Sequence, residues 1–196
     1  MSQSRKSLLP GENPFDDLPM LDLGDGIPMA EVPPGAMLMS NDFLSEVADR
    51  QSNFNALQFF AEADRDGLVF ISSATVHERA WGLVRGSTRG AKVVKEKARA
   101  FHAFLSTFEP SRVVQQGTWD EALLLAEGFN LKGVRDLYSE TSLSNATRLR
   151  TDLIVSLQAW RHEMLVVSSA VDRFLKLRDA VPFPGVIDPE TRAVHR

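Results

Sequence analysis

Basic side chains gather around a glycine-containing turn near the middle of the chain. Between residues 85 and 99, six basic residues face a single acid, which gives a local charge of +5. Ser87 and Thr88 lie between two glycines, and a helix is expected to begin directly after this turn. A helix N-terminus presents free backbone N–H groups and the positive end of the helix dipole, so basic residues beside it can clamp nucleic-acid phosphates. The basic residues are Arg85, Arg89, Lys92, Lys95, Lys97 and Arg99.

The same segment does not match a nucleotide-hydrolysing phosphate loop. That motif places four residues between its glycines and ends in Gly-Lys-Ser/Thr. Here three residues separate Gly86 from Gly90, and Ala91 stands before Lys92. A solvated face whose charges pair with acids elsewhere in the fold would explain the basic residues equally well.

No pattern of side chains indicates catalysis or a metal centre. The carboxylates are scattered along the chain apart from Asp16-Asp17, and no serine lies in a G-x-S-x-G turn. None of the histidines has a second ligand at a metal-binding spacing. These histidines are His77, His102, His162 and His195. We therefore predict a protein that is not an enzyme and that uses no metal and no cofactor.

The distribution of proline predicts the domain boundaries. Six of the ten prolines lie in the first 34 residues and three between residues 182 and 189, which leaves Pro110 alone between them. Proline fixes φ and removes a backbone donor. We therefore expect a disordered, Pro-rich acidic tail over residues 1–39, a helical domain over residues 40–180 and an irregular C-terminal tail over residues 181–196.

The N-terminal tail carries the net charge of the chain. Residues 1–40 hold two basic and six acidic residues, a net of −4, which equals the −4 of the whole chain. Within this tail, residues 15–23 alternate acidic and large apolar side chains, as segments that fold against a protein partner often do. The alternative is a solvated leader that docks on its own domain.

The composition is that of an ordinary globular protein of a reducing compartment. The chain has 196 residues, 43% hydrophobic and 24% charged, which is enough for one sizeable core. It has no cysteine, so disulfides and thiolate sites are excluded. A signal peptide needs an apolar run where only Leu8-Leu9 is present, and charges interrupt the C-terminal apolar stretches before a membrane span accumulates. We expect a cytoplasmic protein without membrane contact.

Hydrophobic spacing predicts a mainly α fold with one short β-strand. A helix capped by Ser40 or Asn41 is expected to run to about Asp64, followed by a strand over residues 68–71. Two further helices are expected over residues 91–107 and 118–128.

The longest predicted element lies near the C-terminus. Apolar residues follow one another at three- or four-residue steps from Ala146 to Phe174, which predicts one helix of about 36 residues ended before Pro182. Its apolar face is broad enough to pack on its own domain and on a second copy. We therefore expect a homo-oligomer formed through this helix.

Residues 136–149 are locally similar to the turn and recognition helix of a helix-turn-helix. Three positions depart from that motif: Tyr138 replaces a small residue, Ser142 the turn glycine and Arg148 a buried aliphatic residue. Ser142 or Ser144 would instead serve as the N-cap of the long helix.

The order of elements around the basic turn resembles a ribbon-helix-helix unit. A strand over residues 68–75 is followed by a short helix over 76–84, the Gly/Ser turn and the helix 91–107. The stretch from Thr75 to Trp81, with Arg85-Gly86, also resembles DNA-binding regulators of conjugative plasmids and integrative conjugative elements. The resemblance covers about a sixth of the chain. It implies a dimer whose strand enters the major groove, with Ser73 and Thr75 facing bases.

These observations predict a DNA-binding regulatory or accessory protein of a mobile element, with double-stranded DNA as its partner. The alternative is a helical assembly or scaffold protein, such as a virion or secretion component, because the pI of about 5.6 and the apolar long helix favour protein contacts. The predicted nucleic-acid-binding residues are Ser73, Thr75, Arg85, Ser87, Thr88, Arg89, Lys92 and Lys95.

Overall fold

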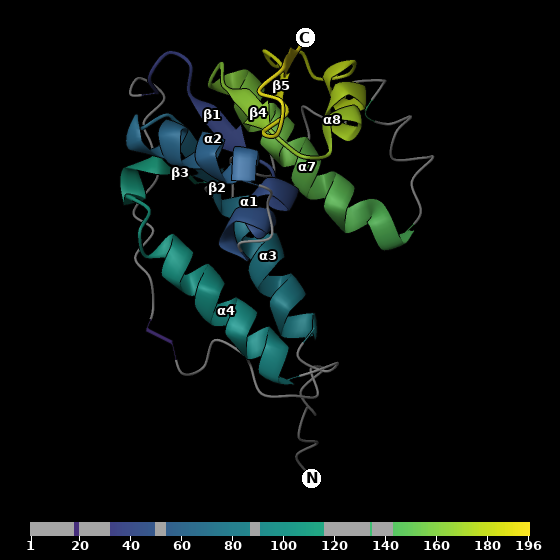
Figure 1. Ribbon diagram of the computed structural model, residues 1–196. Helices are drawn as coiled ribbons and strands as arrows, with labels where there is room; N and C mark the ends of the chain where they lie inside the picture. The colour runs from purple at the N-terminus through teal and green to yellow at the C-terminus, as the bar shows by residue number, and fades with distance from the viewer. Residues whose placement is uncertain (1–17, 20–31, 50–53, 87–90, 116–133, 135–142) are drawn as a thin grey trace.

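The computed structural model is built on a six-stranded sheet that the sequence did not predict (Figure 1). It describes residues 18–19, 32–49, 54–86, 91–115, 134 and 143–196. The strand order is β3-β2-β1-β4-β5-β6, and every neighbouring pair is parallel except β5 and β6. The prediction of a mainly α fold with one short strand is therefore wrong.

The strands are short, and helices connect all of the parallel pairs, whereas a turn joins β5 to the antiparallel β6. The strands are β1 (Met37–Met39), β2 (Val69–Ser72), β3 (Val113–Val114), β4 (Leu165–Val167), β5 (Val186–Ile187) and β6 (Val194–His195). The helices are α1 (Asn41–Ala48), α2 (Phe54–Arg65), α3 (Ser73–Gly86), α4 (Ala91–Leu105), the 3-10 turn η3 (Pro110–Arg112), α7 (Leu143–Arg161) and α8 (Val171–Arg178).

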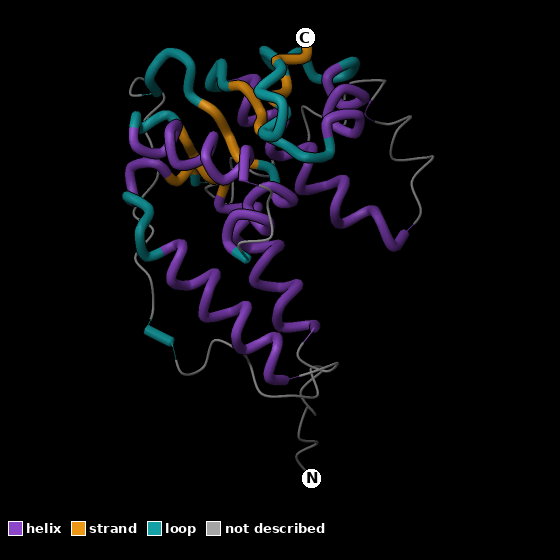
Figure 2. The backbone as a smooth tube through the Cα atoms, in the orientation of Figure 1, coloured by secondary structure: helices purple, strands orange, loops and turns teal. Residues whose placement is uncertain are grey.

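The sheet is doubly wound around β1. From β1 the chain moves outward through β2 to β3, then crosses back to place β4 on the other side of β1 and continues to β5. This reversal of strand order creates a topological switch point between β1 and β4. Figure 2 shows the strands between two sets of helices.

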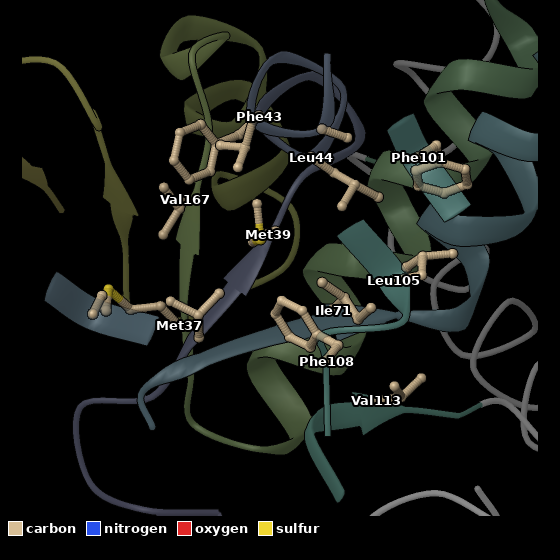
Figure 3. Packing of buried hydrophobic residues seen from close by; sticks show 14 of the residues in the cluster. Met37, Met39, Phe43, Leu44, Ile71, Phe101, Leu105, Phe108, Val113 and Val167 are labelled. Atoms are coloured by element: carbon tan, nitrogen blue, oxygen red, sulfur yellow. The ribbon is translucent and has the colours of Figure 1, made fainter. Parts of the chain in front are cut away.

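Helices cover both faces of the sheet, and alternate residues of β1 belong to different cores. Leu38 packs with α7 and α8 in one buried cluster. Met37 and Met39 belong to the other, which contains side chains from α1 to α4, among them Phe43 and Phe101 (Figure 3). Strands buried on both faces are continuous apolar runs without alternation. At two to four residues long, such runs are easily taken for parts of helices.

The predicted long C-terminal helix is interrupted by a strand. Glu163 has a positive φ of 54°, which ends α7, and β4 follows before α8 begins. Residues 151–159 of α7 are all buried. The breadth of the apolar face is thus explained by packing inside this fold. Self-association stays a prediction, and Trp160, which is exposed, is the residue at which to test it.

Several local predictions are confirmed. Ser40 caps α1 by accepting a hydrogen bond from the backbone N–H of Phe43. The strand 68–71 corresponds to β2, and the helix 91–107 corresponds to α4. The helix predicted from residue 40 to residue 64 is divided into α1 and α2, with residues 50–53 outside the described part of the chain.

The ribbon-helix-helix strand and the two tail boundaries are wrong. Residues 73–75 begin α3, and β2 lies inside the sheet between β1 and β3, where it cannot enter a DNA groove. Residues 1–39 include the central strand β1, and residues 181–196 include β5 and β6. The prolines lie beside these short strands and not within them. Proline cannot donate a hydrogen bond to a neighbouring strand, so it is excluded from the interior of a paired strand.

Other predicted features fall outside the described residues. These are the helix 118–128, most of the tail segment 15–23 and the first half of the helix-turn-helix segment 136–149. Among the described residues, no helix is long and apolar enough to cross a membrane.

Removal of residues 1–39 is expected to abolish cooperative unfolding, because β1 supplies backbone hydrogen bonds to both β2 and β4. A shorter truncation of residues 1–31 keeps β1 and is the matched control. Urea denaturation followed by circular dichroism measures both. A cooperative transition in the longer truncation would contradict the assigned position of β1.

Candidate active site

Three buried serines mark the carboxyl edge of the sheet. Ser40 follows β1, Ser72 ends β2 and Ser168 follows β4, and each is fully buried. Each side chain accepts a backbone N–H from the segment that follows: Phe43, Ala74 and Ala170 respectively. Because the three strands are parallel, the helices α1, α3 and α8 all begin at this edge.

Three carboxylates from three helices converge at the same edge. Asp42 lies in the first turn of α1, Glu78 in α3 and Asp152 in α7. Helix α7 leads into the start of β4, so its earlier turns lie toward the carboxyl edge and bring Asp152 there. We call Asp42, Glu78 and Asp152 the acidic cluster.

Arg173, in the first turn of α8, connects two members of the acidic cluster. Its Nε lies 2.6 Å from Asp152 Oδ2, and its Nη2 is 3.3 Å from Asp152 Oδ1. The same Nη2 donates a hydrogen bond to Asp42 Oδ2. Arg148 of α7 is a second cation at the site, with Nη2 3.8 Å from Asp42 Oδ1. With every group ionised, three carboxylates face two guanidinium groups.

The cluster lies at the topological switch point. Asp42 follows β1 and Arg173 follows β4, and these two strands are hydrogen-bonded neighbours. In open α/β sheets, ligands bind outside the carboxyl ends of the strands where the strand order reverses. The position of the acidic cluster is therefore that of a ligand site.

Burial shifts the pKa of two of the acids upward. Burial raises the pKa of Asp152 to about 7, although the positive charge of Arg173 opposes the shift. Burial also raises the pKa of Glu78, against a hydrogen bond from Thr151 and the charge of Arg148. Glu78 Oε2 is buried and has no hydrogen-bond partner among the described residues. For Arg173, burial works against the charged form, but Asp152 and Asp42 outweigh it and raise the pKa.

Asp42 and Asp152 are the two carboxylates that a hard cation could share at this site. Within the described part of the chain, no group of three or more His, Cys, Asp or Glu side chains is placed to hold a metal ion. Mg²⁺, however, is commonly bound by one or two carboxylates together with water and substrate phosphate. The Nη2 atom of Arg173 marks a point that oxygens of both Asp42 and Asp152 reach. Arg173 pairs with both carboxylates, so a cation could bind between Asp42 and Asp152 only after the guanidinium group moves away.

A second ion network fixes the helix that carries Glu78. Asp49, at the end of α1, has a side chain only 4% exposed, and it lies 2.6 Å from Arg79 and 2.9 Å from Lys97. These contacts join α1 to α3 and α4. Lys97 belongs to the basic segment, so one charge of that segment pairs with an acid of the fold.

The predicted nucleic-acid-binding residues are distributed over both ends of α3 and the start of α4. Ser73 begins α3, whereas Thr75 is fully buried and donates a hydrogen bond to the Ser72 carbonyl. Arg85 is exposed in the last turn of α3, and Lys92 is exposed in the first turn of α4. Lys95 is half-buried on α4. Ser87, Thr88 and Arg89 lie outside the described residues.

Sequence reasoning missed the acidic cluster because its members are far apart in the chain. An apolar triplet followed by serine occurs at Met37–Ser40, Val69–Ser72 and Leu165–Ser168, and in each case the triplet is a strand and a helix follows the serine. The same pattern occurs at Ala103–Ser106 and Leu153–Ser156, where the triplets belong to α4 and α7, so it does not identify a strand by itself.

No protein family, curated protein or solved structure with which the chain was compared matches it.

Replacing Asp152 with Asn is expected to change how stability depends on pH. Between about pH 4 and about pH 7, Asp152 is protonated in the folded wild type and ionised in the unfolded chain. The free energy of unfolding of the wild type therefore falls as the pH rises through this window. Asn does not titrate. Relative to wild type, the free energy of unfolding of Asp152→Asn should therefore rise over this window, by up to about 4 kcal/mol.

Urea titrations at several pH values test this expectation. Asp66→Asn is the matched control, since Asp66 is exposed beside Arg65. A difference between Asp152→Asn and wild type that stays constant with pH would contradict the raised pKa.

Proposed function

We propose that this protein is a divalent-cation-dependent phosphodiesterase acting on nucleic acid. The observation that carries the proposal is the convergence of Asp42, Glu78 and Asp152 at the switch point of a doubly wound sheet. It departs from the sequence-based prediction of a protein without catalytic activity, because carboxylates that are scattered in the sequence lie together in space.

Asp42 and Asp152 would hold the cation between them once the Arg173 side chain has moved off both carboxylates and onto the substrate phosphate. A bound divalent cation neutralises phosphate charge and lowers the pKa of its water. Cation binding would favour the ionised form of Asp152, whose pKa of about 7 leaves it partly protonated near neutral pH. Glu78, with a raised pKa and a partnerless Oε2, is the group suited to accept a proton from attacking water.

The two arginines would contact the substrate phosphate. Arg173 and Arg148 both approach Asp42, and the side chain of Arg148 is 53% exposed. Guanidinium groups bind phosphate oxygens with two parallel hydrogen bonds. The exposed Arg85 and Lys92 extend the positive surface beyond one phosphate, which favours a polymer over a small phosphate ester.

Wild-type protein with Mg²⁺ is expected to cleave fluorescently labelled RNA or DNA oligonucleotides, and EDTA should stop the reaction. Asp42→Asn and Glu78→Gln should lower the rate about 100-fold or more, because they remove a cation ligand and the proposed base. Denaturing gel electrophoresis measures the products.

Glu109→Gln is the matched control for cleavage. Glu109 is an exposed acid that precedes η3 and β3, at the opposite edge of the sheet. The Glu109→Gln variant should cleave the oligonucleotides at the wild-type rate. Equal rates in wild type, Asp42→Asn and Glu78→Gln would contradict the proposal.

A second candidate is the non-enzymatic DNA-binding factor that the sequence predicted. The ion pairs of Arg173 favour this candidate. Arg173 already neutralises part of the negative charge of Asp42 and Asp152, so the cluster would be a structural ion network. The basic segment would then bind duplex phosphates without cleavage. The helical scaffold alternative predicts neither binding nor cleavage.

Salt dependence of duplex binding tests this second candidate. Replacing Arg85, Arg89 and Lys92 together with Ala removes up to three phosphate contacts, which should flatten the log–log salt slope by up to about 2.7. Fluorescence anisotropy at several salt concentrations measures the slope. Wild-type protein that leaves duplex DNA unbound in low salt would exclude this candidate.

A further inference from the structure

Trp81 is a large aromatic side chain on the surface of α3, 45% exposed. It lies three residues after Glu78 and four before Arg85. Residues at positions i, i+3 and i+7 share one face of a helix. On this face, the Glu78 side chain points toward the other residues of the acidic cluster. It forms a hydrogen bond with Thr151 and interacts electrostatically with Arg148, Asp42 and Arg173.

The opposite face of α3 is directed into the protein. Arg79 pairs with Asp49, and Leu83 is buried in the core with α1 and α4. The stripe formed by Glu78, Trp81 and Arg85 is therefore the outward continuation of the acidic cluster along α3. Figure 1 shows α3 running away from the sheet beside α4.

Open surface lies next to the indole. Gly82 follows Trp81, is exposed, and has no heavy atom within 4 Å of the position where a Cβ would lie. Apart from the neighbours Trp81 and Leu83, no side chain of the described residues reaches this position on the helix. An aromatic ring with open surface beside it can receive a flat ligand on its face.

The spacing of these side chains along α3 spans about three nucleotides of a nucleic-acid strand. At a rise of about 1.5 Å per residue, Trp81 lies about 4.5 Å beyond Glu78, and Arg85 about 6 Å beyond Trp81. Successive phosphates of one strand are about 3.4 Å apart along a duplex axis. An indole at this position is within one or two nucleotides of a phosphate at the acidic cluster.

We infer that Trp81 stacks on a nucleobase of the substrate next to the phosphate held at the acidic cluster, and that Arg85 contacts a phosphate about three nucleotides further along the strand. This inference rests on the proposed function and adds a specificity-determining residue to it. Stacking is tolerant of sequence, but a purine presents the larger face, so Trp81 would favour purine at this position.

A nucleobase fits this surface better than a protein partner does. A stable protein interface needs about 800 Å² from each partner and an apolar centre. Here one indole lies between a carboxylate at one end and a guanidinium at the other, with a glycine beside it. Charge at both ends and one aromatic face suit a single base with its phosphate.

Binding of short oligonucleotides in EDTA, where cleavage is prevented, tests the inference by fluorescence anisotropy. Trp81→Ala should weaken oligo(dA) binding about 5- to 150-fold, and oligo(dT) binding by less. Binding of an abasic oligomer of the same length should not change, because it offers no base to stack. Trp81→Phe should retain most of the affinity.

Trp160→Ala is the matched control. Trp160 is 42% exposed but lies at the end of α7 that leads into β4, at the opposite edge of the sheet, and its loss should leave binding unchanged. Unchanged oligo(dA) binding in Trp81→Ala, with cleavage of labelled oligonucleotides by wild type intact, would overturn the stacking inference alone. Equal weakening of oligo(dA) and abasic binding would overturn it too. Wild type that neither binds oligo(dA) nor cleaves would overturn the proposed function as well.

Discussion

The two halves of this fold meet at β1, a strand of three residues that is hydrogen-bonded on both sides. Met37 donates to the Leu68 carbonyl on one side, while Ser40 donates to the Val167 carbonyl on the other. β1 is therefore the point at which the strand order reverses and the point from which Asp42 projects. The location of the acidic cluster depends on this pairing, because Asp42 and Arg173 follow two neighbouring strands of one sheet edge.

The ion network at this edge joins several helices, but burying its charges costs free energy of folding. Asp152 is fully buried, and removing a carboxylate from water costs several kcal/mol unless a partner compensates. Arg173 offsets part of that cost, yet the pKa of Asp152 stays near 7, so the compensation is incomplete. A well-packed apolar residue in place of Asp152 would avoid the cost. A buried acid with a perturbed pKa beside a half-buried guanidinium group is a feature that is common at functional sites.

Local signals in the sequence were sufficient to predict some individual helices and strands, but they were insufficient to predict the sheet. The cap at Ser40, the strand at β2 and the helix α4 follow from chemistry within a few residues. The strands β1 and β4 could not be recognised in this way. Met37–Met39 follows two prolines, and Leu165–Val167 continues the helical spacing of α7. Their strand conformation depends on pairing with residues far away in the chain. The acidic cluster, drawn from α1, α3 and α7, depends on the same pairing.

Helix α3 connects the parts of the proposed site rigidly. Its start is held by the Ser72 side chain at the sheet edge, and Arg79 anchors its inner face to Asp49 between α1 and α4. The outer face carries Glu78 and Trp81 on one straight element, so their separation does not vary with loop movement. Groups held on helices keep their geometry better than groups held on loops. A site assembled in this way can combine proton transfer at Glu78 with recognition of the adjacent base at a fixed distance, because both side chains share one anchored backbone.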